Sequence, residues 1–180
     1  ASGGGAAALT IEDVFQTYVR TGTGAEEVVT TGIDMTEGYM LWSKGRSGAT
    51  DHAAYDSERG VTKDLVTNST AAETTQAQGL KAVSDTGHTI GTLAKMNTNT
   101  ATYVDWVFRK APRFFDVVKY TGNGIAGKEI AHELGIKPGM MIVKNLTTIS
   151  NWMVYHVSTT ATHYLGLNIT DAATPLTEIW

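Results

Sequence analysis

Met40-Leu-Trp-Ser-Lys44 and Met140-Met-Ile-Val-Lys144 are two short, largely apolar stretches that lie 100 residues apart in the sequence. Short apolar runs bounded by turn residues are typical of buried strands. Aromatic and β-branched residues make further strand candidates at residues 89–93, 102–108 and 152–157. No segment shows a long apolar period of 3.6 residues. The pattern therefore predicts an all-β fold, an antiparallel β-sandwich.

The same offset relates a much longer part of the chain. Residues 15–74 and 115–174 share 13 identities in 60 positions, where average composition gives roughly four by chance. We therefore expect a flexible linker at residues 1–10, a first β repeat at residues 11–112 and a second, partial repeat at residues 113–180. Either the repeat is partial by design or the chain is a piece of a longer protein, and we favour the second.

Two local signals refine this prediction. Thr10, followed by Glu12 and Asp13, is a suitable N-cap for a short helical turn at residues 9–15. Phe114 to Tyr120 has the composition of a strand, and it runs into Thr121-Gly-Asn-Gly124. Because Asn-Gly is a strong hairpin signal, we expect a β-hairpin there.

Composition excludes several classes of protein. The 180 residues include 18 acidic and 14 basic side chains, for a net charge of −4, and no cysteine. The chain therefore lacks the basic patch of a nucleic-acid binder, and it can form neither disulfides nor thiolate metal sites. No apolar run approaches the roughly 18 residues of a membrane span, so we expect no membrane insertion. Threonine fills 28 positions, which favours strands.

The motifs give no catalytic, cofactor or metal site. Residues 122–129, Gly-Asn-Gly-Ile-Ala-Gly-Lys-Glu, match the start of a phosphate-binding loop. That loop needs Ser or Thr after the lysine, and Glu129 would repel phosphate instead. His132-Glu133 begins a zinc-protease motif whose last histidine is replaced by Ile136. We therefore expect no cofactor and no metal, and we do not expect an enzyme.

Two other functions stay open on the residues alone. A polysaccharide-degrading enzyme needs paired carboxylates, and the densest acidic cluster is Asp51, Asp56 and Glu58. A secreted carbohydrate-binding β-sandwich module needs an exposed aromatic ring with polar neighbours. Trp152 follows polar residues and is the best candidate for exposure, with Asn151 and His156 as companion glycan contacts. The apolar context of Trp42 and Trp106 favours core packing for those two rings.

Four segments together resemble one protein group. They are Ile11-Glu-Asp-Val-Phe-Gln-Thr-Tyr18, GIDMTEGYMLWSKGRSGATDHAAYDSER at residues 32–59, Asn68-Ser-Thr-Ala-Ala-Glu-Thr-Thr75, and Trp106-Val-Phe-Arg-Lys-Ala-Pro-Arg-Phe-Phe-Asp-Val-Val118. The group is an uncharacterised tandem-repeat domain of virion proteins from marine tailed bacteriophages, often described as tail-fibre-like. The stretch from Tyr120 to Lys144 resembles its second copy.

The resemblance implies a jelly-roll-like form for the sandwich of two related repeats, a structural role and no catalytic residues. We expect a virion protein, in a tail fibre or surface appendage, that lies on the particle and contributes to host attachment. Phage fibres are commonly trimers, so the resemblance implies a homotrimer that contacts other virion proteins and, at the host surface, a glycan. The alternative is the secreted carbohydrate-binding module described above.

Overall fold

β9 (Thr102–Arg109) alternates between half-buried and buried residues along most of its length, and it lies inside the first antiparallel sheet of the computed structural model. The structure describes residues 8–176 and 180, so residues 1–7 of the predicted linker lie outside it. The first sheet has the strand order β1 (Phe15–Thr21), β9, β3 (Tyr39–Gly45) and β4 (Ala53–Asp56). The predicted strands at residues 40–44 and 102–108 are thus confirmed.

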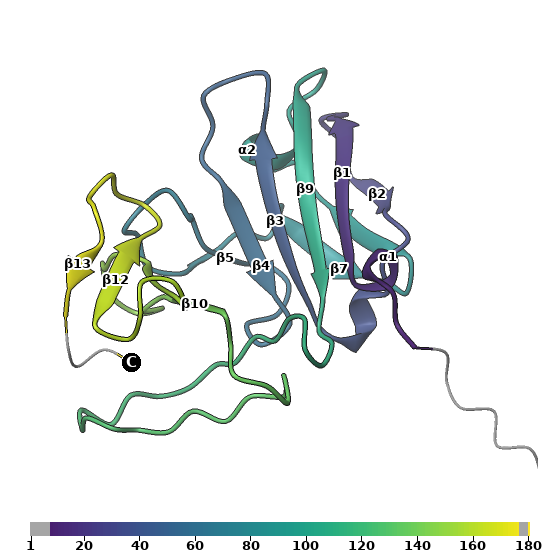
Figure 1. Cartoon of the computed structure of the whole chain (residues 1–180). Helices are drawn as coiled ribbons and strands as arrows, with labels where there is room; N and C mark the ends of the chain where they lie inside the picture. The colour runs from purple at the N-terminus through teal and green to yellow at the C-terminus, as the bar shows by residue number, and fades with distance from the viewer. Residues whose placement is uncertain (1–7, 177–179) are drawn as a thin grey trace, which may run out of the picture.

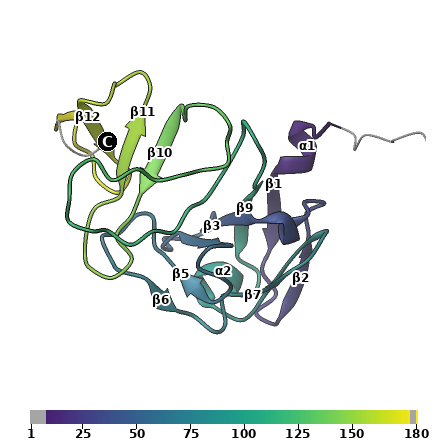
Figure 2. The same cartoon turned by 90° about the horizontal axis from the view of Figure 1, so that it is seen from below.

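A second sheet lies against the first, as Figures 1 and 2 show, and consists of β2 (Glu27–Thr30), β8 (Gly87–Ile90) and β7 (Leu80–Val83). Every second residue of β3 and β9 is buried between the two layers. This apolar core also receives side chains from the short helices η1 (Met35–Glu37) and α2 (Ala94–Asn97). The all-β, sandwich-like fold predicted from the sequence is confirmed.

A further antiparallel sheet lies toward the C-terminal end, in green and yellow in Figure 1. Its order is β10 (Met140–Val143), β11 (Met153–His156), β12 (His163–Gly166) and β13 (Thr174–Pro175). The matching part of the first half has β3, β4, and the paired strands β5 (Lys63–Asp64) and β6 (Thr74–Thr75). We name residues 39–76 unit 1 and residues 139–176 unit 2.

Units 1 and 2 contain the same hydrogen bonds at the same offset. The Oδ1 atom of Asn68 accepts from the backbone N–H of His52 at 2.9 Å, and Asn168 accepts from Trp152 at 2.8 Å. Lys44 donates its ammonium to the carbonyl of Thr50, as Lys144 does to that of Ser150. The two units are therefore alike in local structure, while the domain boundaries at residues 10 and 112 stay a prediction.

The expected hairpin at residues 114–124 is wrong, because residues 116–139 contain neither strand nor helix. The aromatic ring of Phe114 stacks on Phe108 at 6.3 Å, so it folds back on the first sheet. Asp116 accepts from the backbone N–H of Glu133 at 2.7 Å and pairs with Lys110 at 3.0 Å. These tertiary contacts replace the strand pairing that the local composition favours.

The predicted helical turn is confirmed as α1 (Ile11–Val14), shown beside the first sheet in Figure 1. The Oδ2 atom of Asp13 accepts from the backbone N–H of Thr10 at 2.7 Å and from its hydroxyl at 3.0 Å. The Asp13 carboxylate thus satisfies the backbone N–H of Thr10, at the start of the helix. Over the described part of the chain, every helix is too short or too polar to cross a membrane.

Candidate functional site

The outer face of the first sheet carries a group of aromatic side chains. Trp42 of β3 lies directly opposite Trp106 of β9, and their rings meet edge to face at 5.9 Å. Phe108 continues the group along β9, and its ring lies 4.9 Å from that of Phe15 on β1. All four side chains are half-buried. We call Trp42, His52, Trp106 and Phe108, which line one hollow, the aromatic face.

The hollow on the aromatic face has a volume of about 280 Å³ and an almost entirely apolar lining. The Nε1–H of Trp42 donates to Nδ1 of His52 at 2.9 Å, which fixes both rings. Burial lowers the pKa of His52, and the nearby Lys44 lowers it further. A neutral His52 that accepts at Nδ1 carries its proton on Nε2. The rim of the hollow therefore offers one ring N–H donor beside indole surfaces.

The expectation that Trp42 and Trp106 pack in the core is wrong. Strand alternation places both with Lys44 on the outer face, while Leu41 and Val107 point into the core. The signal was present in the sequence, because residues two apart on a strand share a face and Lys44 does not enter an apolar core.

The expectation that Trp152 is exposed is also wrong, since it retains only 8% of its accessible surface. Its ring packs against Ala54 and Leu65 of unit 1. Its Nε1–H points at the carbonyl oxygens of Val66 and Ser69, at 3.1 and 3.2 Å. A buried indole with its donor satisfied has no free face for a sugar ring. Trp152 is instead the anchor of the contact between the two units.

The companions proposed for Trp152 do not gather around it. Asn151 precedes β11 and accepts from the side chain of Asn168 at 3.0 Å. His156 is the last residue of β11, and its Nδ1 accepts from the backbone N–H of Ser158 at 3.2 Å. The two side chains therefore lie at opposite ends of one strand. They form no common groove with the tryptophan.

The unit contact also depends on Lys144. Its ammonium donates to the carbonyl of Ser150 at 3.0 Å and to that of Thr70 in unit 1 at 3.2 Å. Burial lowers the pKa of Lys144. The backbone N–H of Ser150 also donates to Thr70 O at 3.0 Å, and that of Glu73 donates back to Leu146 O at 2.9 Å. We call these bonds, with the Trp152 anchor, the unit contact.

Lys144→Met should lower the free energy of unfolding by about 1–3 kcal/mol, because the half-buried carbonyls of Thr70 and Ser150 lose the ammonium donor while the apolar stem is kept. The matched control is Lys44→Met, since Lys44 bonds only within unit 1, to Thr50. Hydrogen exchange should show the difference: only Lys144→Met raises the exchange of amides in residues 66–73. Equal exchange of that loop in both variants would contradict the role of Lys144 in the unit contact.

The most deeply buried charged group lies between the sheets and is not exposed for catalysis. Asp105 accepts from Arg20 Nε at 2.6 Å and from the Ser43 hydroxyl at 2.5 Å, with His88 Nε2 at 3.5 Å. Burial raises the pKa of Asp105, but His88 and Arg20 outweigh it and hold the pKa below its usual value. Ser43 donates to the carboxylate rather than to the imidazole, so this is not a nucleophile triad. We call these four residues the buried cluster.

The acidic cluster proposed for glycoside hydrolysis is not assembled across a cleft. Asp51 precedes β4 and accepts from the side chain of Asn68 at 3.0 Å, whereas Asp56 is the last residue of that strand. The carboxylate of Asp56 is paired with Arg59 at 2.6 Å. Glu58 is exposed. The structure thus separates Asp51 from Asp56 and uses Asp56 in a structural ion pair.

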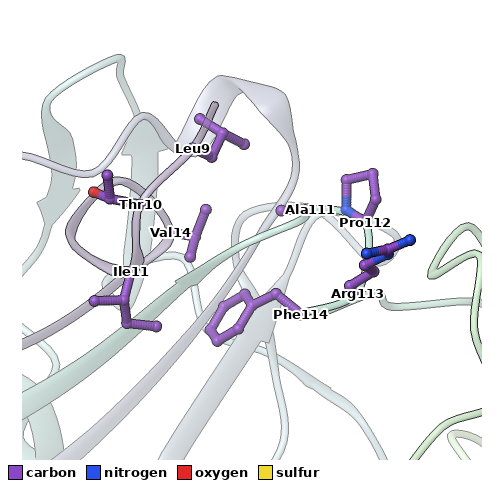
Figure 3. Close-up of a pocket in the computed structure, with 8 residues that line it drawn as sticks. All are labelled: Leu9, Thr10, Ile11, Val14, Ala111, Pro112, Arg113 and Phe114. Carbon is purple, nitrogen blue, oxygen red and sulfur yellow. The ribbon is translucent and has the colours of Figure 1, made fainter. Parts of the chain in front are cut away.

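A second hollow lies where α1 meets the end of β9, and Figure 3 shows its lining. It has a volume of about 430 Å³ and is wide open. Its residues are mainly apolar, with one guanidinium group: Leu9, Thr10, Ile11, Val14, Ala111, Pro112, Arg113 and Phe114. No buried polar side chain points into it, so it offers packing surface rather than chemistry.

Neither of the rejected ligand motifs becomes a site in three dimensions. Residues 122–129 form an exposed loop, in which Lys128 donates to the carbonyl of Thr121 at 2.8 Å. Within the ranges that the structure describes, no three His, Asp or Glu side chains are grouped so that they could hold a metal ion.

The comparison with protein families identifies the chain. A model described as "Domain of unknown function (DUF7483)" matches residues 11–180. The chain belongs to this family, which extends over both units. No curated protein matches the sequence. No solved structure matches the fold.

Proposed function

We propose that this chain is a structural component of a tailed-phage virion, in a tail fibre or surface appendage, that contributes to host attachment. The sequence resemblance of residues 11–18, 32–59, 68–75 and 106–118 to virion proteins supports the proposal. On this proposal the chain forms a homotrimer, contacts other virion proteins, and has no catalytic role.

The unit contact is the observation that carries the proposal. Unit 2 is attached to unit 1 by a buried indole, a half-buried lysine and backbone hydrogen bonds. Appendages must keep their shape outside the cell, and this chain has no cysteine with which to form disulfides. Two deeply buried charged groups, Asp105 and Arg20, are likewise paired with each other. The described interactions therefore favour holding a shape over performing a reaction.

Immunogold electron microscopy tests this role directly. An antibody raised against the purified chain should label the tail or a surface appendage of virions whose genome encodes this sequence. Pre-immune serum is the control. Label confined to the soluble fraction of infected cells, with bare virions, would contradict the proposal.

One observation favours the alternative, a secreted carbohydrate-binding module. Trp42 and Trp106 leave indole surface open beside the ring of His52, and sugars bind such surfaces through ring stacking. If this alternative holds, Trp106→Ala should weaken glycan binding in an array or by calorimetry about tenfold or more. His156→Ala, on unit 2, is the matched control and should leave binding unchanged. A wild-type chain that binds no glycan in the array would remove this alternative.

A further inference from the structure

We infer that two copies of this chain associate head to tail, with the aromatic face of one copy packed on residues 165–173 of unit 2 in the other. The inference goes beyond the proposed function and can be tested with the purified chain alone. It follows from the unit contact, in which one unit binds a second, similar unit within the same chain.

The receiving surface of unit 1, made by Ala54, Leu65 and residues 66–73, is covered by unit 2. Its equivalent on unit 2 is covered only in part: Val154, the counterpart of Ala54, is buried, but the residues that follow are more open. Leu65 retains 3% of its accessible surface, whereas Leu165 is only half-buried. Residues 70–73 are half-buried, whereas residues 170–173 are exposed. Among the described residues, nothing donates a hydrogen bond to the carbonyls of Ile169 or Thr170, the counterparts of Ser69 and Thr70.

The donating surface of unit 2 also has a counterpart on unit 1. Lys44 holds the carbonyl and hydroxyl of Thr50, just as Lys144 holds those of Ser150, which leaves an ammonium N–H for one more acceptor. Within the described ranges the backbone N–H of Thr50 has no acceptor, although that of Ser150 donates to unit 1.

His52 occupies the position that Trp152 has in unit 2. Its Nδ1 is taken by Trp42, so the free Nε2–H of the neutral ring is the counterpart of the indole donor. Trp42 itself corresponds to Ile142, which packs on the apolar part of the unit contact. Unit 1 thus carries, on and beside the aromatic face, the same kinds of group in the same sequence order as the surface of unit 2 that contacts unit 1.

Two positions at which the units differ carry opposite charges. Unit 1 has exposed Arg46 where unit 2 has Leu146, and unit 2 has exposed Asp171 where unit 1 has Ala71. The contact within the chain is therefore uncharged at these positions, while the contact between chains would bring a guanidinium to a loop that carries a carboxylate. Charge complementarity of this kind favours one partner and one orientation.

A second copy of the chain is favoured over a glycan as the occupant of the aromatic face. The corresponding surface of unit 2, around Trp152, contacts backbone carbonyls and aliphatic side chains of unit 1, which are groups that a protein supplies and a glycan does not. Because the two surfaces differ, the association is heterologous, and it forms a ring if the rotation closes or a filament if it does not. A ring of three copies gives the homotrimer of the proposed function.

Complementation between two blocked variants tests the inference. Trp42→Lys blocks the aromatic face, and Leu165→Lys blocks the receiving surface, so each variant keeps one working surface. By size-exclusion chromatography with light scattering, each variant alone should be monomeric. An equimolar mixture should form a 1:1 dimer that grows no further. Val28→Lys, an exposed valine of the other sheet, is the matched control and should assemble as the wild type does.

A charge swap between exposed residues covers the case in which a blocked variant fails to fold. Arg46→Glu and Asp171→Arg should each weaken association about tenfold, and mixing the two should restore it. A wild-type chain that stays monomeric at about 100 µM would overturn the inference. So would a blocked variant that still dimerises alone, because that contact would join identical surfaces. Neither result would affect the labelling of virions, so failure here is distinct from failure of the proposed function.

Discussion

Asp105→Ala should lower the free energy of unfolding by about 3–5 kcal/mol, because it leaves the buried guanidinium of Arg20 without its carboxylate. Arg20 would keep only its bond to the Met96 carbonyl, at 2.7 Å, and its position over the ring of Tyr103, at 4.8 Å. Domains of this size have about 5–15 kcal/mol in total, so the variant should lie close to unfolding at room temperature. Denaturant titration followed by circular dichroism measures the loss.

The control for this change is Asp85→Ala, which removes an exposed carboxylate from the turn before β8. Its effect should stay within about 0.5 kcal/mol. A loss below about 1 kcal/mol for Asp105→Ala would contradict the prediction that the buried Arg20 depends on this carboxylate.

The buried cluster also sets a pH dependence. The pKa of Asp105 in the fold lies below its value in the unfolded chain, so the unfolded chain binds more protons in acid. The stability from this carboxylate is therefore present above an unfolded-state pKa of about 4, and it is lost as the pH falls through the folded-state pKa. Between about pH 5 and 2, the free energy of unfolding should fall more steeply for the wild type than for Asp105→Asn. Equal slopes would contradict this account.

Trp152→Ala should release unit 2 from unit 1. Truncating a buried tryptophan costs about 3–5 kcal/mol, and here it also removes the indole N–H that the Ser69 carbonyl accepts. The Val66 carbonyl loses the indole donor but keeps the backbone N–H of Ser69. Hydrogen exchange should become fast in β10, β11 and β12, while β3 and β9 keep their protection. Trp152→Phe is the matched variant, and it should cost about 1–2 kcal/mol because the ring packing remains. Unchanged protection of β11 in Trp152→Ala would contradict the anchoring role.

The sequence was sufficient for the class of fold, and the physical reason is local. The strands that were predicted, β3 and β9, are short runs rich in apolar and aromatic residues, and such runs are typical of strands that pack against a core. The offset of 100 residues was also visible in the sequence, where Asn68 and Asn168 recur. In the structure both side chains accept a backbone N–H at the equivalent position.

The sequence was not sufficient for the roles of the tryptophans. Trp152 is buried by unit 1, which is distant in sequence, so no local pattern could indicate its burial. Trp42 could have been placed correctly from its spacing to Lys44, but the apolar neighbours Leu41 and Met40 concealed the alternation. Long-range contacts explain both this outcome and the missing strand at residues 114–120.

The buried cluster was also not predictable as a unit. Asp105 lies in an apolar strand, which marks it as unusual, but its partners Arg20, Ser43 and His88 come from three other strands. Only the order of the sheets brings these four side chains together. The pairing of a buried charge is therefore a property of topology rather than of any short motif.

Sedimentation equilibrium of the unmodified chain tests the central claim, that this is an assembly module, most directly. The account predicts a mass well above 19.3 kDa that rises with concentration toward a closed oligomer, three copies if the ring of the proposed homotrimer forms. Raising the salt concentration should lower the apparent association constant, because the inferred contact would bring Arg46 to the loop that carries Asp171. A single species of 19.3 kDa at every concentration would contradict the claim.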